Sequence, residues 1–229
     1  MTFTFQRIPV GICNCYLLRG DQTVLIDGGA WGGLPAFKQA LASLHVDPKE
    51  ISLILLTHGH WDHITCLADI QKMTGAKIAV HGRDQFMVES GEPPFPNGVN
   101  GYGKAMSWLS KRILHPHLPP LKVDTVIPDS GMSLKSFGIP GQVIYTPGHS
   151  MGHVSILLET GDVIAGDMAM NDWYLRLTPG LPVLADDINL VVESWKKILP
   201  LGVKRIYPAH GRDFAVEIIH KEIQAFKSK

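Results

Sequence analysis

The sequence has no excess of charge, no long apolar run and few cysteines, and each absence excludes a class of protein. Its 229 residues contain 21 lysines and arginines and 21 aspartates and glutamates, so the formal net charge is zero. A balanced chain gives no electrostatic reason to bind nucleic acid or an anionic membrane, and we expect neither as a partner. No apolar stretch approaches the roughly 20 residues that a membrane-spanning helix needs.

Two further absences concern the compartment. Residues 1–10 lack the basic segment and apolar stretch of a secretory signal peptide, so we expect a cytoplasmic protein. Three cysteines, Cys13, Cys15 and Cys66, are too few for a disulfide framework. We interpret all three as small buried residues rather than metal ligands or redox groups, because free cysteine is among the most buried residue types.

Short apolar strands alternate with helical patterns in both halves of the chain. The uninterrupted apolar run at 51–56 is typical of a strand buried on both faces, and a helical pattern at 64–73 and a strand at 77–80 follow it. The second half repeats this logic. We therefore predict an α/β fold in which two mixed sheets pack face to face with helices outside, as a single domain over residues 1–229. The Pro- and Gly-rich segment at about 92–120 is expected to be an inserted lid or flap.

Four side chains that bind divalent metals lie within six residues directly after the apolar run that ends at Leu56. They are His58, His60, Asp62 and His63. Neutral imidazole and carboxylate suit zinc and similar ions, and a catalytic site needs such donors with a position left open for water. A polar loop with histidines in chance proximity is the alternative, but a set this dense favours a metal site.

This pattern resembles the H-x-H-x-D-H signature of the metallo-β-lactamase-fold superfamily, which residues 58–63 match without substitution. Three more motifs of that superfamily follow in order: Thr146-Pro147-Gly148-His149-Ser150, Ala165-Gly166-Asp167 and Pro208-Ala209-His210-Gly211. The resemblance implies a four-layer αββα sandwich with two divalent metal ions, zinc being expected and iron or manganese being alternatives. It assigns His58, His60 and His149 to the first metal, Asp62, His63 and His210 to the second, and Asp167 to both.

Two residues next to these motifs have alternative interpretations. His153 follows the third motif and also occurs in the superfamily, where it is not a ligand, so we expect it to support the ligands or to pack. Asp27 ends a strand near the expected site, where it could orient a ligand imidazole or cap a turn.

The resemblance implies hydrolysis. Two divalent ions that share a carboxylate can hold a bridging hydroxide at neutral pH and polarise a carbonyl or phosphoryl oxygen, and Asp62 is expected to accept the proton of the attacking hydroxide. The ligands carry no information about the substrate. We expect a small-molecule ester, thioester or lactone.

The chain departs from the motifs of each branch of the superfamily, so the resemblance does not identify the substrate. Glyoxalase-type thioester hydrolases usually have three consecutive histidines where this chain has Gly59 in the middle, and they carry a helical C-terminal domain beyond the position of His210. Arg176, nine residues after Asp167, matches a basic substrate-binding residue of that branch. Acyl-homoserine lactonases place a tyrosine three residues after the bridging aspartate, where this chain has Met170.

Other branches fit less well. True β-lactamases are usually secreted and usually lack the complete second ligand set, and the phosphodiesterase and RNA-processing branches have extra domains or motifs that we do not find. A phosphodiesterase stays an alternative. Persulfide dioxygenases are an alternative of another class, because they resemble these hydrolases but use one iron for oxygen chemistry.

Aromatic residues and one arginine are candidates for the substrate pocket. They would form an apolar surface with one basic anchor for an acidic substrate. The candidates are Tyr102, Met106 and Trp108 in the insert, and Trp173, Tyr174 and Arg176 beyond Asp167. For the first three, an ordinary amphipathic helix packed on the domain is the alternative. A homodimer is an alternative to a monomer, because the sequence does not determine the oligomeric state.

Overall fold

Two six-stranded sheets form the centre of the protein, described here by a computed structural model that covers residues 3–227. The first sheet has its strands side by side in chain order: β1 (Thr4–Val10), β2 (Cys13–Arg19), β3 (Thr23–Ile26), β4 (Ile51–Leu55), β5 (Lys77–His81) and β6 (Thr125–Ile127). The pairs from β1 to β3 are antiparallel and those from β3 to β6 are parallel. The first sheet is therefore mixed, as predicted.

The second sheet has the order β12-β11-β10-β9-β8-β7. Its strands are β7 (Met132–Ser133), β8 (Gly141–Tyr145), β9 (Val154–Leu158), β10 (Asp162–Asn171), β11 (Arg205–Gly211) and β12 (Phe214–Ala215). All neighbours are antiparallel except β10 and β11, which are parallel and whose register shifts between Gly166 and Met170. This irregular stretch contains Asp167.

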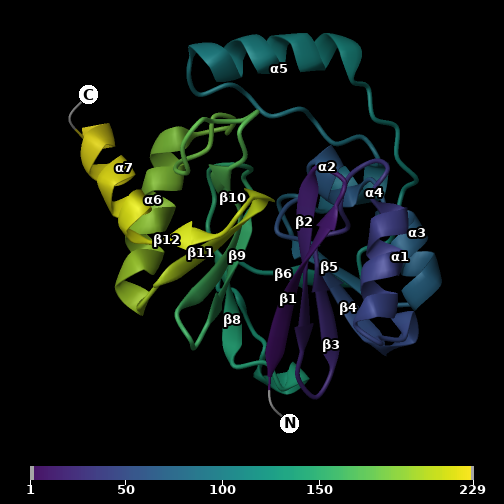
Figure 1. Cartoon of the computed structure of the whole chain (residues 1–229). Helices are drawn as coiled ribbons and strands as arrows, with labels where there is room; N and C mark the ends of the chain where they lie inside the picture. The colour runs from purple at the N-terminus through teal and green to yellow at the C-terminus, as the bar shows by residue number, and fades with distance from the viewer. Residues whose placement is uncertain (1–2, 228–229) are drawn as a thin grey trace.

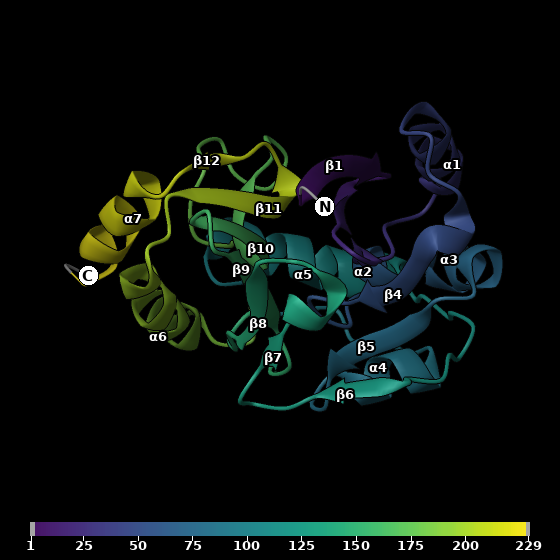
Figure 2. The ribbon, with the colours of Figure 1, turned by 90° about the horizontal axis from the view of Figure 1, so that it is seen from below.

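Helices cover the outer face of each sheet (Figures 1 and 2). On the first sheet lie α1 (Leu34–Ser43) and α3 (Leu67–Thr74), and on the second lie α6 (Ile188–Ile198) and α7 (Glu217–Lys227). The remaining helices are α2 (Trp61–Ile64), α4 (Gln85–Ser90) and α5 (Gly101–Ile113), with short 3-10 turns at Pro48–Glu50, Lys135–Phe137 and Leu199–Leu201. This is the predicted four-layer αββα sandwich.

The inner strands, such as β3, β4 and β9, are largely apolar because both of their faces are buried. Successive residues of a strand point to opposite faces. Val24 and Ile26 of β3 accordingly lie in the core between the two sheets, whereas Leu25 packs with Phe37 and Leu41 of α1 in the core beneath the helices. A third core lies between the second sheet and α6 and α7.

Two details differ from the sequence-based expectation. The helix expected over 64–73 is divided into α2 and α3, because the backbone N–H of Cys66 donates to the carbonyl of Gly29 instead of continuing the helix. The segment at 4–10, for which no strand was expected, is the edge strand β1, which pairs residue by residue with β2.

The insert contains α5, which crosses the top of the molecule in Figure 1 above both halves. The side chain of Asn100 caps the start of this helix by accepting a hydrogen bond from the N–H of Gly103, 2.8 Å away. Across residues 3–227, no helix is long and apolar enough to cross a membrane.

Candidate metal centre

The seven predicted ligands come from four places in the sequence, and the fold brings them together. His58 and His60 lie in the loop after β4, and Asp62 and His63 lie in α2. His149 lies between β8 and β9, Asp167 in β10 and His210 in β11. The first sheet thus supplies four of the groups and the second sheet supplies the other three.

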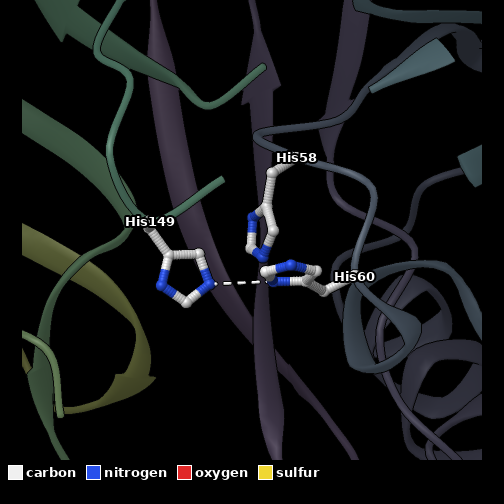
Figure 3. Close-up of side chains that lie close together, drawn as sticks. All are labelled: His58, His60 and His149. Carbon is white, nitrogen blue, oxygen red and sulfur yellow. Dashed lines mark hydrogen bonds between the residues drawn. The ribbon is translucent and has the colours of Figure 1, made fainter. Parts of the chain in front are cut away.

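His58, His60 and His149 form the first ligand set. One ring nitrogen of each lies within 4.8 Å of the others, and Nδ1 of His60 is 2.9 Å from Nε2 of His149 (Figure 3). Burial lowers the pKa of all three imidazoles, that of His60 to about 3. The rings are therefore neutral at physiological pH, which leaves a nitrogen lone pair on each for a metal ion.

Asp62, His63 and His210 form the second ligand set, again within 4.8 Å of one another. Nε2 of His210 lies 3.1 Å from Oδ2 of Asp62. Burial opposes a charge on either histidine, but the carboxylates around them outweigh it. Asp27 and Asp167 raise the pKa of His63 well above its ordinary value, and Asp167 and Asp62 raise that of His210. Without metal, the two histidines of this set therefore favour their protonated forms.

Asp167 lies between the two sets. Its Oδ2 is 3.4 Å from Nε2 of His149 and 3.5 Å from Nε2 of His210, and its Oδ1 is 3.4 Å from Nε2 of His63. Burial disfavours its charged form, but His210, His149 and His63 lower its pKa well below the ordinary value. An ionised carboxylate in this position can serve both ligand sets.

Several buried atoms of this cluster have no hydrogen-bond partner among the described residues. One is Nε2 of His58, and the other two are Nε2 of His63 and Oδ1 of Asp167, which lie 3.4 Å apart without the geometry of a hydrogen bond. A buried polar group left unpaired costs about 1–3 kcal/mol, so such groups rarely gather in one place without a reason. Divalent cations would supply the missing partner to all three, and the nitrogen and oxygen donor set is the one that suits zinc. The residues therefore fit the metal.

The ring nitrogens that face away from the cluster are also fixed. Nδ1 of His63 lies 3.0 Å from Oδ2 of Asp27, and Nδ1 of His58 lies 3.1 Å from the hydroxyl of Thr57. Nδ1 of His149 is 2.9 Å from the carbonyl of Leu184, and Nδ1 of His210 is 2.9 Å from that of Ile12. Such partners fix the tautomer and the direction of a ligand ring. Asp27 therefore orients an imidazole.

Cys13 lies near the second set but differs from its ligands. Its sulfur is 3.7 Å from Nδ1 of His63, the nitrogen that also contacts Asp27. Burial raises the pKa of the Cys13 thiol, so the group stays protonated and is a poor metal ligand. Like Cys15 and Cys66 it is buried, as the sequence predicted.

His153 supports the bridging position. Its Nε2 accepts a hydrogen bond from the backbone N–H of Asp167 at 3.2 Å, and its Nδ1 lies 3.1 Å from the hydroxyl of Thr146. Burial lowers the pKa of His153 well below its ordinary value, so the ring is neutral and its Nε2 can accept. Its location matches a supporting role.

Sequence reasoning missed Asp84, a fully buried carboxylate beyond β5. It accepts hydrogen bonds from the N–H of Gly59, the N–H of Gly152 and the hydroxyl of Ser150. The available signal was its place just after a parallel strand that neighbours β4, because such strand ends share one edge of the sheet. The glycine in the middle of the first motif also has a reason here: a Cβ on Gly59 would lie 2.8 Å from Cβ of Met87.

A small cavity of about 130 Å³ opens above the ligands. Five ligands form part of its wall, and the insert contributes several of the side chains that cover it. The wall consists of Ile12, His60, Trp61, Asp62, Phe95, Pro96, Met106, Ser110, Leu114, His149, Asp167, Met170, Tyr174, Leu175, Leu184 and His210. Of the described residues that line it, none is a lysine or an arginine.

Of the predicted substrate contacts, Met106 and Tyr174 line the cavity, and the Tyr174 hydroxyl lies 3.3 Å from Nδ1 of His210. Burial raises the pKa of Tyr174 to about 12, so the phenol keeps its proton. Tyr102, Trp108 and Trp173 are instead turned to solvent, with 55%, 59% and 80% of their surface exposed.

Arg176, the expected basic anchor, does not line this cavity. The guanidinium of Arg176 contacts both carboxylate oxygens of Glu222 at 3.2 Å and donates to the carbonyl of Leu181. These partners hold it outside the cavity. Arg112, another nearby cation, lies 3.8 Å above the exposed ring of Trp108.

Comparison with known proteins finds relatives that match most of the chain. A probable metallo-hydrolase of Methanocaldococcus jannaschii is 26% identical over 86% of this chain and 87% of its own length. A probable metallo-hydrolase of Bacillus subtilis is 28% identical over 89% and 82%. The crystal structure of an archaeal metallo-beta-lactamase superfamily protein from Sulfolobus tokodaii superposes with a TM-score of 0.70 at 25% identity, covering 100% of this chain and 88% of that one.

The sequence profile of the metallo-beta-lactamase superfamily matches residues 8–210, a range that contains all seven predicted ligands. Its metallo-hydrolase relatives and the clustered histidines and aspartates support a metal-dependent hydrolase. This chain therefore belongs to the metallo-beta-lactamase superfamily.

Proposed function

We propose that the protein is a dinuclear metal-dependent hydrolase that cleaves an ester, thioester or lactone bond in a small, uncharged and largely apolar molecule. The observation that carries the proposal is the convergence of seven nitrogen and oxygen donors, with unpaired buried atoms among them, beneath an apolar cavity. His58, His60 and His149 would hold one ion, Asp62, His63 and His210 the other, and Asp167 both. We expect zinc as the natural metal.

Each group has a distinct task in this proposal. Bound divalent ions would supply a hydroxide nucleophile at neutral pH and polarise the carbonyl oxygen of the substrate. The carboxylate of Asp62 lies in the cavity wall, where it can accept a proton as the nucleophile attacks. His63 and His210, which hold protons in the metal-free chain, must release them when metal binds.

The cavity wall supports the choice of an uncharged substrate. Most of its side chains that are not ligands are aliphatic or aromatic, apart from Ser110 and the phenol of Tyr174. A carboxylate at the end of the acyl group that lies away from the metal ions would lose its hydration here and meet no lysine or arginine, which costs several kcal/mol. The volume of about 130 Å³ also favours a short acyl group unless α5 moves.

The first experiment is elemental analysis of protein purified without added metal or chelator. We expect close to two zinc, manganese or iron ions per chain, loss of esterase activity on chelation and its return with zinc. Asp62→Ala should abolish turnover, whereas retained activity would contradict its role. A single tightly bound iron with an empty second site, together with oxygen consumption when a persulfide is added, would instead indicate a persulfide dioxygenase.

A matched pair of substrates tests the proposal that the substrate is uncharged. A neutral p-nitrophenyl butyrate and its analogue with a terminal carboxylate differ mainly in charge. We expect kcat/KM to be at least about tenfold higher for the neutral ester, since 1.4 kcal/mol of lost transition-state binding already gives that factor. Equal or better turnover of the anionic ester would contradict the assigned substrate class.

A further inference from the structure

Asp84 connects two loops that carry proposed metal ligands, although it is not a ligand itself. Its Oδ2 accepts hydrogen bonds from the N–H of Gly59 at 3.0 Å and from the hydroxyl of Ser150 at 2.6 Å. Its Oδ1 accepts one from the N–H of Gly152 at 2.8 Å. Because the side chain is fully buried, these three bonds replace the water that a free carboxylate would hold.

Both of the connected loops serve the first ligand set. Gly59 separates His58 from His60, and Ser150 directly follows His149. Asp84 therefore spans the gap between the loop after β4, in the first sheet, and the loop after β8, in the second.

The packing around this carboxylate is close. A Cβ added to Gly152 would lie 2.4 Å from Oδ1 of Asp84, so this loop reaches the carboxylate only because it has a glycine at that position. Ser150 is likewise fully buried. The contact therefore has little freedom to adjust, and its removal would release both loops at once.

The second ligand set has separate supports. Asp27 contacts Nδ1 of His63 at 3.0 Å, and the carbonyl of Ile12 contacts Nδ1 of His210 at 2.9 Å. Neither of these groups bonds to the loop that carries His149. Asp27 also accepts hydrogen bonds from the N–H and the hydroxyl of Thr57, and that hydroxyl lies 3.1 Å from Nδ1 of His58. Asp27 therefore contacts both sets, whereas the bonds of Asp84 go only to the loops of the first set.

We propose that Asp84 is a positioning residue for the first metal, fixing the distance between the pair His58 and His60 on one sheet and His149 on the other. This inference rests on the proposed function only in requiring that the first set binds a divalent metal. Removing a supporting group of this kind typically lowers metal affinity by about 10–100-fold. The loss should be confined to the first site, because Asp84 contacts neither His63 nor His210.

The test uses variants that retain one site each. His210→Ala removes a ligand of the second set, and His149→Ala removes a ligand of the first. Zinc affinity is measured in each background by competition with a chromophoric chelator, with and without Asp84→Asn. The asparagine keeps the size of the side chain but replaces one accepting oxygen with a donor, so at least one of the three hydrogen bonds is lost.

We expect Asp84→Asn to weaken zinc binding about 10–100-fold in the His210→Ala background and to leave it unchanged in the His149→Ala background. Asp27→Asn should weaken zinc binding in both backgrounds, because Asp27 contacts His63 directly and His58 through the hydroxyl of Thr57. Asp124→Asn is the matched control, because its carboxylate also accepts a backbone hydrogen bond, from Ile78 at 3.0 Å, but at the opposite end of β5. It should change neither affinity.

Equal losses in both backgrounds, or no loss in either, would overturn the role of Asp84. If zinc binds to neither background with Asp84 intact, the proposed metal function fails instead, so the two failures are distinguishable. Ser150→Ala, which removes a single hydrogen bond, provides a milder variant if Asp84→Asn does not fold, and it should cause a smaller loss at the same site. The ligand-field absorption of bound cobalt(II) gives an independent readout of the first site's geometry.

Discussion

Trp195 connects helix α6 to the strand that carries the proposed bridging aspartate. The side chain is fully buried, and its indole Nε1–H donates to the carbonyl of Met168 at 2.8 Å. Met168 directly follows Asp167 in the irregular part of β10, where pairing with β11 shifts register. The indole thus supplies a hydrogen bond in a stretch where the regular ladder is interrupted.

Replacing Trp195 with phenylalanine would remove this donor and part of the ring volume. A buried carbonyl left without its partner costs about 1–3 kcal/mol. The void left by the smaller ring adds about 1 kcal/mol, since residual cavities cost about 24 cal/mol per Å³. We therefore expect the free energy of unfolding to fall by about 2–4 kcal/mol, which corresponds to a decrease in Tm of about 5–15 °C for a chain of this size.

The assay is guanidinium denaturation of metal-stripped protein, so that metal binding does not contribute to stability. Trp173→Phe is the control, because 80% of that side chain is exposed and its replacement should change stability by less than about 0.5 kcal/mol. If Trp195→Phe is no more destabilised than this control, the reasoning about the Met168 carbonyl is wrong.

Three further outcomes follow from the site. Burial lowers the pKa of four imidazoles, His58, His60, His149 and His153. Below about pH 6.5 these imidazoles bind protons in the unfolded chain but not in the folded chain. Each of the four should therefore reduce the folded-to-unfolded ratio of metal-stripped protein by up to about tenfold per pH unit. A denaturation midpoint that rises from pH 6.5 to pH 5.5 would contradict this expectation. Arg176→Ala should lower Tm through loss of the contacts with Glu222 but leave kcat/KM for a neutral ester unchanged, and a large rise in KM would restore its role as an anchor. Met106→Ala should enlarge the cavity and raise the kcat/KM ratio of octanoate to butyrate esters about tenfold, whereas an unchanged ratio would place the acyl group elsewhere.

The sequence by itself indicated the layers of the fold and the candidate ligand set. Strands buried on both faces must be apolar throughout, so the residue types of a run such as 51–56 are enough to indicate an interior sheet. Ligands are chemically distinctive and lie close to strand ends, which is why the four groups at 58–63 and the later motifs could be recognised by residue type and order.

Tertiary structure alone decided what surrounds those ligands. Arg176 had the right charge and spacing for an anchor, but the position of Glu222 on α7, distant in sequence, holds it outside the cavity. The exposure of Trp108 and the inward direction of Met106 depend on how α5 is docked, since helical periodicity alone does not say which face meets the site.

Asp84 shows most clearly what the sequence indicates and what only the tertiary structure decides. An aspartate after a strand is also typical of a turn, so its place beside β4 could suggest a role at the site but not its partners. Those three partners come from two loops, 25 residues before it and 66 and 68 residues after it. Metal ligands can be recognised by composition, because few residue types can bind the ion. The groups that hold those ligands in place use ordinary hydrogen bonds between distant segments, and only the packed fold determines which segments meet.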